Sequence, residues 1–179
     1  PVVSVVSDAL VAPVHNKVTI KDSVLSGTAD PFDGVVSCSH SECAISSSVI
    51  DVPPTNNGVV CLSSTCALDE VRIAATVGRG VICSSVGVPL VTSTCTLDRV
   101  SITVDVGASF LCSDSDCSVS DSSLRANATD NAAAHDSIAM QCASSSCVVA
   151  DSELEAKSTA RGFEATGSRA VFRNTRIHT

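Results

Sequence analysis

The sequence contains no tryptophan and no tyrosine, and it has only four phenylalanines and one methionine. Single-stranded nucleic acids are usually bound by stacking their bases on aromatic side chains, so this shortage argues against that class of partner. Hydrophobic residues nevertheless make up 44% of the chain. The core must therefore consist of Val, Ile, Leu, Ala and Cys, whose small and uniform side chains suit thin, regular layers.

Cationic residues are also scarce, because eleven Lys and Arg stand against nineteen Asp and Glu, a formal net charge of −8. Such a surface repels phosphate backbones, which further excludes nucleic acid as a partner. No apolar run approaches the ~20 residues that span a bilayer, so we expect no membrane insertion. No segment keeps an apolar period of 3.6 residues, which argues against stacked helices.

What the sequence does contain is a repeat. A six-residue frame returns seven times, with an apolar residue first, four mostly polar or small residues next, and Ile or Leu last. The frames begin 22–30 residues apart, a period typical of one supersecondary unit stacked on copies of itself. The seven frames are 20–25, 45–50, 68–73, 97–102, 119–124, 149–154 and 172–177.

Each frame predicts a strand end, a sharp polar corner and a second strand. Positions 2 and 3 are mostly polar, such as Asp98 and Arg99, and Asp, Ser and Asn are common in turns. Positions 4, 6 and 8 lie on one face of a strand, because side chains alternate with a period of two. A further strand is predicted before each cysteine pair, at 34–36, 58–60, 80–82, 108–111 and 138–141, reached through loops of variable length.

The pattern of an apolar residue, a polar corner and Ile or Leu resembles that of the right-handed parallel β-helix superfamily, the pectate-lyase-like folds. The best copies are VTIKDSVLSG at 18–27 and VFRNTRIHT at 171–179. The resemblance implies an all-β fold: a single domain over 1–179, with about seven coils of 22–30 residues over 18–179. It implies architecture alone, since this fold carries many functions.

The ten cysteines form five closely spaced pairs, four of them with the spacing C-x4-C. This is not the usual zinc spacing, and disulfides in an oxidising compartment are favoured, so we expect a secreted or cell-surface protein. Pairing between neighbouring coils would leave one of five cysteines over in each column, so pairing within each coil is favoured. The pairs are Cys38 and Cys43, Cys61 and Cys66, Cys83 and Cys95, Cys112 and Cys117, and Cys142 and Cys147.

Converging catalytic groups are not evident, and we expect no enzyme activity, no cofactor and no metal site. The four histidines are scattered, and the acidic cluster of Asp114, Asp116 and Asp121 matches no calcium-binding motif. His40, between Cys38 and Cys43, is interpreted as a polar corner residue. Asn127 begins an Asn-X-Thr sequon and is a candidate for glycosylation.

The two ends of the predicted stack are candidates for assembly. The segment 1–17 is apolar and predicts either a cap on its own domain or a strand donated to the next subunit. At the other end, the last frame would expose core positions. The candidate interface residues are Val2, Val3, Val5, Val6, Leu10, Val11, Phe172, Thr175 and Ile177.

The expected function is structural: a subunit of an extracellular filament, or of a surface stalk, built by end-to-end stacking. Head-to-tail self-association is the expected partnership. Two other function classes remain as alternatives, a polysaccharide-binding or polysaccharide-degrading β-helix protein and an ice-binding solenoid. The first would need a cleft lined with converging acids and bases, and the second a flat array of Thr or Ser.

Overall fold

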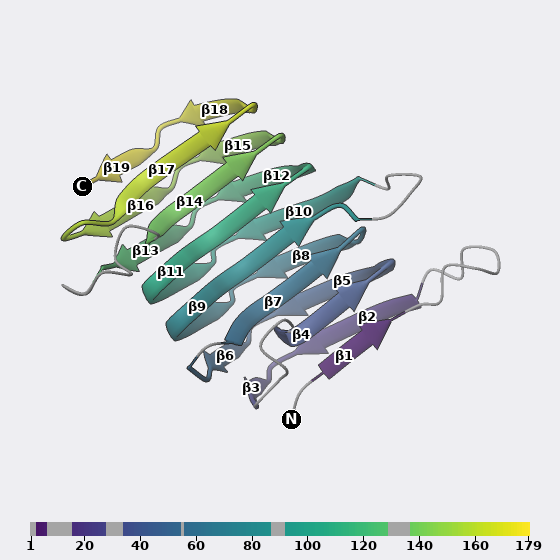
Figure 1. The fold of residues 1–179 in the computed structure, drawn as a ribbon. Helices are drawn as coiled ribbons and strands as arrows, with labels where there is room; N and C mark the ends of the chain where they lie inside the picture. Colours follow the sequence, from purple (N-terminus) through teal and green to yellow (C-terminus); the bar gives the residue numbers. More distant parts are fainter. Residues whose placement is uncertain (1–2, 7–15, 28–33, 55, 87–91, 129–136) are drawn as a thin grey trace.

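A computed structural model describes residues 3–6, 16–27, 34–54, 56–86, 92–128 and 137–179. Every regular element in these ranges is a β-strand, and every strand pair is parallel. The strands form two sheets that face each other, and successive repeats climb from the N-terminal to the C-terminal end (Figure 1). This arrangement is consistent with the predicted β-helix class.

The smaller sheet holds the strands that precede each frame's corner. Its order is β18-β15-β12-β10-β8-β5-β2, so each repeat lies beside the next. Its strands are β2 (Asn16–Lys21), β5 (Ser41–Ser46), β8 (Thr65–Asp69), β10 (Ser93–Asp98), β12 (Ser115–Ser120), β15 (Ser146–Ala150) and β18 (Arg169–Arg173).

The larger sheet holds two strand positions of each repeat, the one after the frame's corner and the one before the cysteines. Both positions fuse in β9 and β11, which link the two rows of strands. Its strands are β1 (Val3–Val6), β3 (Val24–Ser26), β4 (Gly34–Ser39), β6 (Val49–Val52), β7 (Asn56–Leu62), β9 (Arg72–Ser84), β11 (Ser101–Ser113), β13 (Ser123–Asn127), β14 (Ile138–Ala143), β16 (Glu153–Lys157), β17 (Arg161–Thr166) and β19 (Arg176–His178).

The repeated apolar positions form continuous columns in the core. Leu97 pairs with Leu68 on one side and Val119 on the other, and Ile102 occupies the matching column of the larger sheet. All four side chains are at most 1% exposed. The frame register predicted from the sequence is therefore confirmed, and Phe110 is among the largest side chains that this core fully buries.

One expectation about the loops is wrong for two repeats. A loop was predicted between the frame and the following strand, but β9 and β11 each run through this point as a single strand of 13 residues. Gly78 and Gly107 make the continuous path possible. Their φ angles are 132° and 129°, and a Cβ on Gly107 would lie 1.8 Å from the carbonyl oxygen of Gly78.

The predicted polar corners are confirmed as left-handed turns. Eleven of the described corners each place one residue at a φ of 46–54°, a region that Asn and Asp enter more readily than most residues. These residues are Asp22, His40, Ser47, Ser63, Glu70, Arg99, Asp114, Asp121, Ser144, Asp151 and Asn174.

The residue after each left-handed corner points into the stack, and it is usually a buried serine. The hydroxyl of Ser122 donates to the carbonyl of Ser120 at 2.6 Å and accepts from the backbone N–H of Val100 at 2.9 Å. The N–H of Ser122 in turn donates to the hydroxyl of Ser152 at 3.2 Å. These serines therefore satisfy buried backbone groups from one repeat to the next.

We expect Ser122→Ala to lower the free energy of unfolding by about 1–3 kcal/mol, because the N–H of Val100 would remain buried without its acceptor. Ser101→Ala is a matched control, since Ser101 is exposed. Urea denaturation of both variants checks this. Equal stability of the two variants would show that the corner hydroxyls are dispensable.

Candidate functional site

The structure pairs all ten cysteines within repeats, as the spacing favoured. The five disulfides join Cys38 to Cys43, Cys61 to Cys66, Cys83 to Cys95, Cys112 to Cys117, and Cys142 to Cys147. Each bond links the larger sheet to the smaller one, and every cysteine is at most 3% exposed. The cysteines also stack in register between repeats, so the disulfides form a column inside the core.

Neighbouring disulfides lie close together without forming a metal site. The sulfurs of Cys61, Cys66 and Cys95 lie within 4.8 Å of one another. A metal binds the thiolate form, however, and all three sulfurs are held in disulfides. His40 does not join such a cluster among the described residues; its Nδ1 lies 2.9 Å from the hydroxyl of Ser39.

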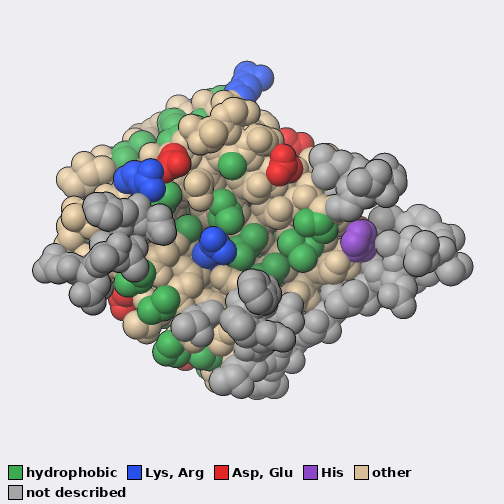
Figure 2. Space-filling view, in the orientation of Figure 1, with side chains coloured by type: hydrophobic (Ala, Val, Ile, Leu, Met, Phe, Trp, Pro, Cys, Tyr) green, Lys and Arg blue, Asp and Glu red, His purple; other side chains and the backbone are tan. Residues whose placement is uncertain are grey.

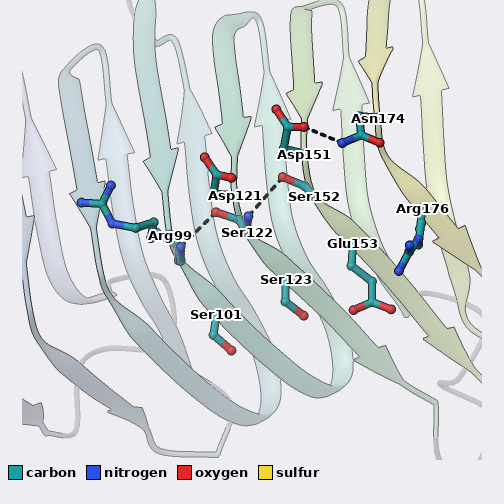
Figure 3. Close-up of a pocket in the computed structure, with 11 residues that line it drawn as sticks. Arg99, Ser101, Asp121, Ser122, Ser123, Asp151, Ser152, Glu153, Asn174 and Arg176 are labelled. Carbon is teal, nitrogen blue, oxygen red and sulfur yellow. Dashed lines mark hydrogen bonds between the residues drawn. The ribbon is translucent and has the colours of Figure 1, made fainter.

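A surface groove follows one corner of the stack across four repeats (Figure 3). It has a volume of about 500 Å³ and is open to solvent. Its floor and walls come from equivalent frame positions, the corner residue and the two that follow. The lining residues are Arg99, Val100, Ser101, Asp121, Ser122, Ser123, Asp151, Ser152, Glu153, Asn174 and Arg176.

The groove presents carboxylates and hydroxyls at its centre and cations at its ends. Asp121 and Asp151 come from the corners of neighbouring repeats, and Asn174 in the next repeat donates to Asp151 at 2.7 Å. Figure 3 shows Arg99 at one end and Arg176 at the other. These carboxylates, hydroxyls and cations can form hydrogen bonds with a polar chain.

The sequence reasoning missed this groove. The sequence places Asp121 in an acidic cluster with Asp114 and Asp116, but the structure separates them. Asp114 and Asp116 line a smaller hollow of about 300 Å³ at the corner between the cysteines, whereas Asp121 lies at the other corner. Comparing equivalent frame positions would have found the groove.

Arg99 connects three acidic residues beside the groove. Its guanidinium contacts Asp69 at 2.5 Å, Asp98 at 2.7 Å and Glu70 at 3.3 Å. Desolvation lowers the pKa of Arg99, but the negative charges of Asp69, Asp98 and Glu70 outweigh it and raise the pKa above its usual value. Arg99 thereby allows Asp69 and Asp98 to lie directly opposite each other in paired strands.

Several charged side chains gather around Glu155 on the outer face. Register places Arg125 and His178 on either side of Glu155, and Arg125 and Lys157 both form ion pairs with it. His178 itself contacts Glu153 at 3.3 Å. Desolvation raises the pKa of Glu155, but the hydrogen bonds and charges of Lys157 and Arg125 outweigh this effect and lower the pKa overall.

Because the pKa of Glu155 is lower in the folded chain, its ionised form stabilises the fold at neutral pH. This contribution is present above the unfolded pKa of about 4.3 and is lost as the pH falls through the folded value. We therefore expect Glu155→Gln to be less stable than the parent at pH 7 and to match it near pH 2. Chemical denaturation at both pH values measures the difference. A difference that does not change with pH would contradict this assignment.

Asn127 lies in β13 rather than in an exposed loop. Its Nδ2 donates to Asp105 at 3.3 Å, and its Oδ1 is buried without a partner. A glycan on Nδ2 would have to replace this hydrogen bond, so glycosylation at Asn127 stays a prediction that the local geometry does not favour.

The outer faces show no regular array of threonines. The column after the frame's corner runs Val24, Val49, Arg72, Ser101, Ser123, Glu153 and Arg176. On the face drawn in Figure 2, charged side chains are scattered rather than gathered in one patch. Among the described residues, this column therefore does not supply the flat Thr or Ser array that the ice-binding alternative needs.

At the N-terminal end, β1 pairs with β4 of the same chain, with Val3 opposite Val36 and Val5 opposite Cys38. Residues 3–6 thus extend their own sheet, and the choice between a cap and a donated strand stays a prediction. The predicted interface residues Val2, Leu10 and Val11 lie outside the described residues.

At the C-terminal end, β17, β18 and β19 each pair with a strand on one side only. Phe172 and Ile177, which continue the core columns, are 38% and 45% exposed, and Thr175 is partly buried. Phe172 also packs edge-on against Phe163, with ring centroids 4.8 Å apart. The predicted exposure of core positions in the last frame is therefore seen in the structure.

No described helix has the length and apolar character needed to cross a membrane. No family model, no curated protein and no solved structure matches this chain.

Proposed function

We propose that this protein is a structural, non-enzymatic element of an extracellular filament or surface stalk. In this proposal the chain winds as a right-handed parallel β-helix of about seven coils. The five buried disulfides support an oxidising, extracellular environment, where such bonds form and persist.

The observation that carries the proposal is the continuity of the core columns. Each column keeps its register through every described repeat and reaches the outermost strands, where Phe172 and Ile177 remain partly exposed. A stack of this kind can be lengthened by further layers with the same spacing of about 4.8 Å. Adding layers in this way would give a filament or stalk its length and stiffness.

The mechanical role follows from the direction of the bonds. Backbone hydrogen bonds between repeats run along the stack, while the disulfides cross-link the two sheets in five of the layers. Pulling along the stack must break many hydrogen bonds at once. Unfolding of a single layer is opposed by its disulfide, which shortens the loop that could open.

Immunogold electron microscopy of the native, non-reduced source material tests this function. We expect label along filaments or stalks at the cell surface or outside the cell. Label inside cells, or only on dispersed soluble particles, would contradict a structural role outside the cell.

The groove favours polysaccharide binding as a second candidate. Its carboxylates and hydroxyls are spaced by the repeat, so a chain of sugars could contact successive layers. The absence of Trp and Tyr removes the usual stacking platforms. A glycan array with the parent and with Asp151→Asn separates the candidates, because binding that depends on Asp151 would favour this second function.

A further inference from the structure

The outermost layers carry much of the chain's positive charge. Lys17 and Lys21 lie on β2, and four of the eight arginines lie within 161–176, on β17, β18 and β19. Residues 158–179 contain these four arginines and one glutamate, a net charge of +3, whereas the whole chain has −8. The stack is therefore acidic along its length and basic at its C-terminal end.

Register shows which residues would meet if one copy stacked on another. Residues that lie opposite one another in successive paired strands form a column along the stack. The column that begins at Lys17 includes Glu42 and Asp116 and ends at Arg169. The column of Lys21 ends in the same way at Arg173. If β2 of a second copy followed β18 in register, Lys17 would lie opposite Arg169 and Lys21 opposite Arg173. Like charges directly opposite in paired strands are destabilising.

The internal seams of the stack follow the opposite pattern. Lys17 lies 3.8 Å from Glu42, which belongs to the next repeat along the stack. In the same way, Arg125 forms an ion pair with Glu155 of the repeat that follows its own. Where two acids meet, at Asp69 and Asp98, the guanidinium of Arg99 bridges them. No described pair of strands places one cation directly opposite another, whereas the seam between two copies would do so twice.

The same bridging cannot be supplied at the seam between copies. Asp22 occupies the same corner position in its repeat as Arg99 does in its own. Its side chain is short and carries a single negative charge, whereas two pairs of cations, Lys17 with Arg169 and Lys21 with Arg173, would need to be neutralised. Arg169 and Arg173 are exposed, and neither takes part in an ion pair with another described residue. Their charges are therefore fully available to an approaching layer.

We infer that the C-terminal end of the stack binds a parallel β-layer of a different polypeptide, one that carries carboxylates opposite Arg169 and Arg173. Identical copies are held apart by the like charges of their ends. This inference rests on the proposed structural function and names its partner: the assembly alternates between this chain and an acidic-ended one. The exposed Phe172 and Ile177 supply the apolar centre of the interface, and the arginines supply its selectivity.

A charge-reversed copy is the probe for this partner. The variant with Lys17→Glu, Lys21→Glu, Arg169→Glu and Arg173→Glu has acidic residues at both ends. We expect the parent alone and the variant alone to stay unassembled at about 20 mM salt, where charges act over ~20 Å. An equimolar mixture should assemble, with an apparent association constant about ten- to a hundredfold higher than either protein alone.

Sedimentation velocity and negative-stain electron microscopy measure the assembly, and thermal unfolding confirms that the variant folds. Salt at 0.5 M should reduce the advantage of the mixture, because the screening length falls to about 4 Å. Assembly of the parent alone to the extent of the mixture would overturn the inference while favouring the filament function. A mixture as unassembled as its components would overturn it as well.

A second variant covers the case in which the quadruple change prevents folding. Arg169 and Arg173 pair with Ser146 and Ala150, which are uncharged, so Arg169→Glu with Arg173→Glu creates no like-charge pair inside the stack. This double variant keeps its basic N-terminal end, and we expect it to polymerise with itself. Failure to do so while folded contradicts the inference, whereas failure of the immunogold experiment would contradict only the structural function.

Discussion

Reduction of the five disulfides is expected to unfold this protein at ambient temperature. Four of the bonds close loops with a sequence separation of 5 and one closes a loop of 12. In the chain-entropy model each bond contributes about 2–3 kcal/mol, and the five together about 12 kcal/mol. This total is comparable to the whole stability of a typical domain, about 5–15 kcal/mol, so the apolar core alone should not hold the stack together.

Thermal unfolding followed by circular dichroism, with and without a reducing agent, measures this effect. Cys112→Ser with Cys117→Ser, which removes one internal bond, should lower the stability by about 2 kcal/mol and leave the chain folded. A reduced chain that melts within a few degrees of the oxidised one would show that the small-residue core suffices.

The strands and corners could be predicted because each repeat carries its own local signals. The alternation that ends in Ile or Leu identifies the inward face, as at Ile102, and the polar residues before it identify the corner, as at Arg99. The cysteine pairing followed from parity and spacing. Apart from the parity, which counts all ten cysteines, these signals lie within 12 residues of one another, so they could be interpreted without knowing how distant segments meet.

The groove and the end charges could not be predicted in the same way, because they depend on register between repeats. Asp121, Asp151 and Asn174 are separated by 30 and 23 residues and become neighbours only when the corners stack. The fused strand β11 was missed for a different reason. The sequence predicts a loop between each frame and the following strand, but at Gly107, whose φ is positive, β11 continues as one strand.

We expect Ile102→Asp to abolish folding. Ile102 is fully buried between Ile73 and Leu124 in the core column of the larger sheet. A carboxylate there has no hydrogen-bond partner in the apolar column, and the lost packing adds to the cost of burying it. The sum should exceed about 4 kcal/mol, and Leu97→Asp in the smaller sheet should act in the same way.

Two matched substitutions separate burial from other causes. Ile102→Val keeps an apolar side chain and should cost only about 0.5–1.5 kcal/mol. Ser101→Asp introduces the same carboxylate one residue away on the exposed face, and it should change the stability by less than about 0.5 kcal/mol. Circular dichroism and secretion yield compare the three variants. The opposite outcome, in which Ser101→Asp unfolds the chain and Ile102→Asp does not, would contradict the assigned register. The inward and outward faces of this strand would then have to be exchanged, because a shift of one residue moves every side chain to the other face.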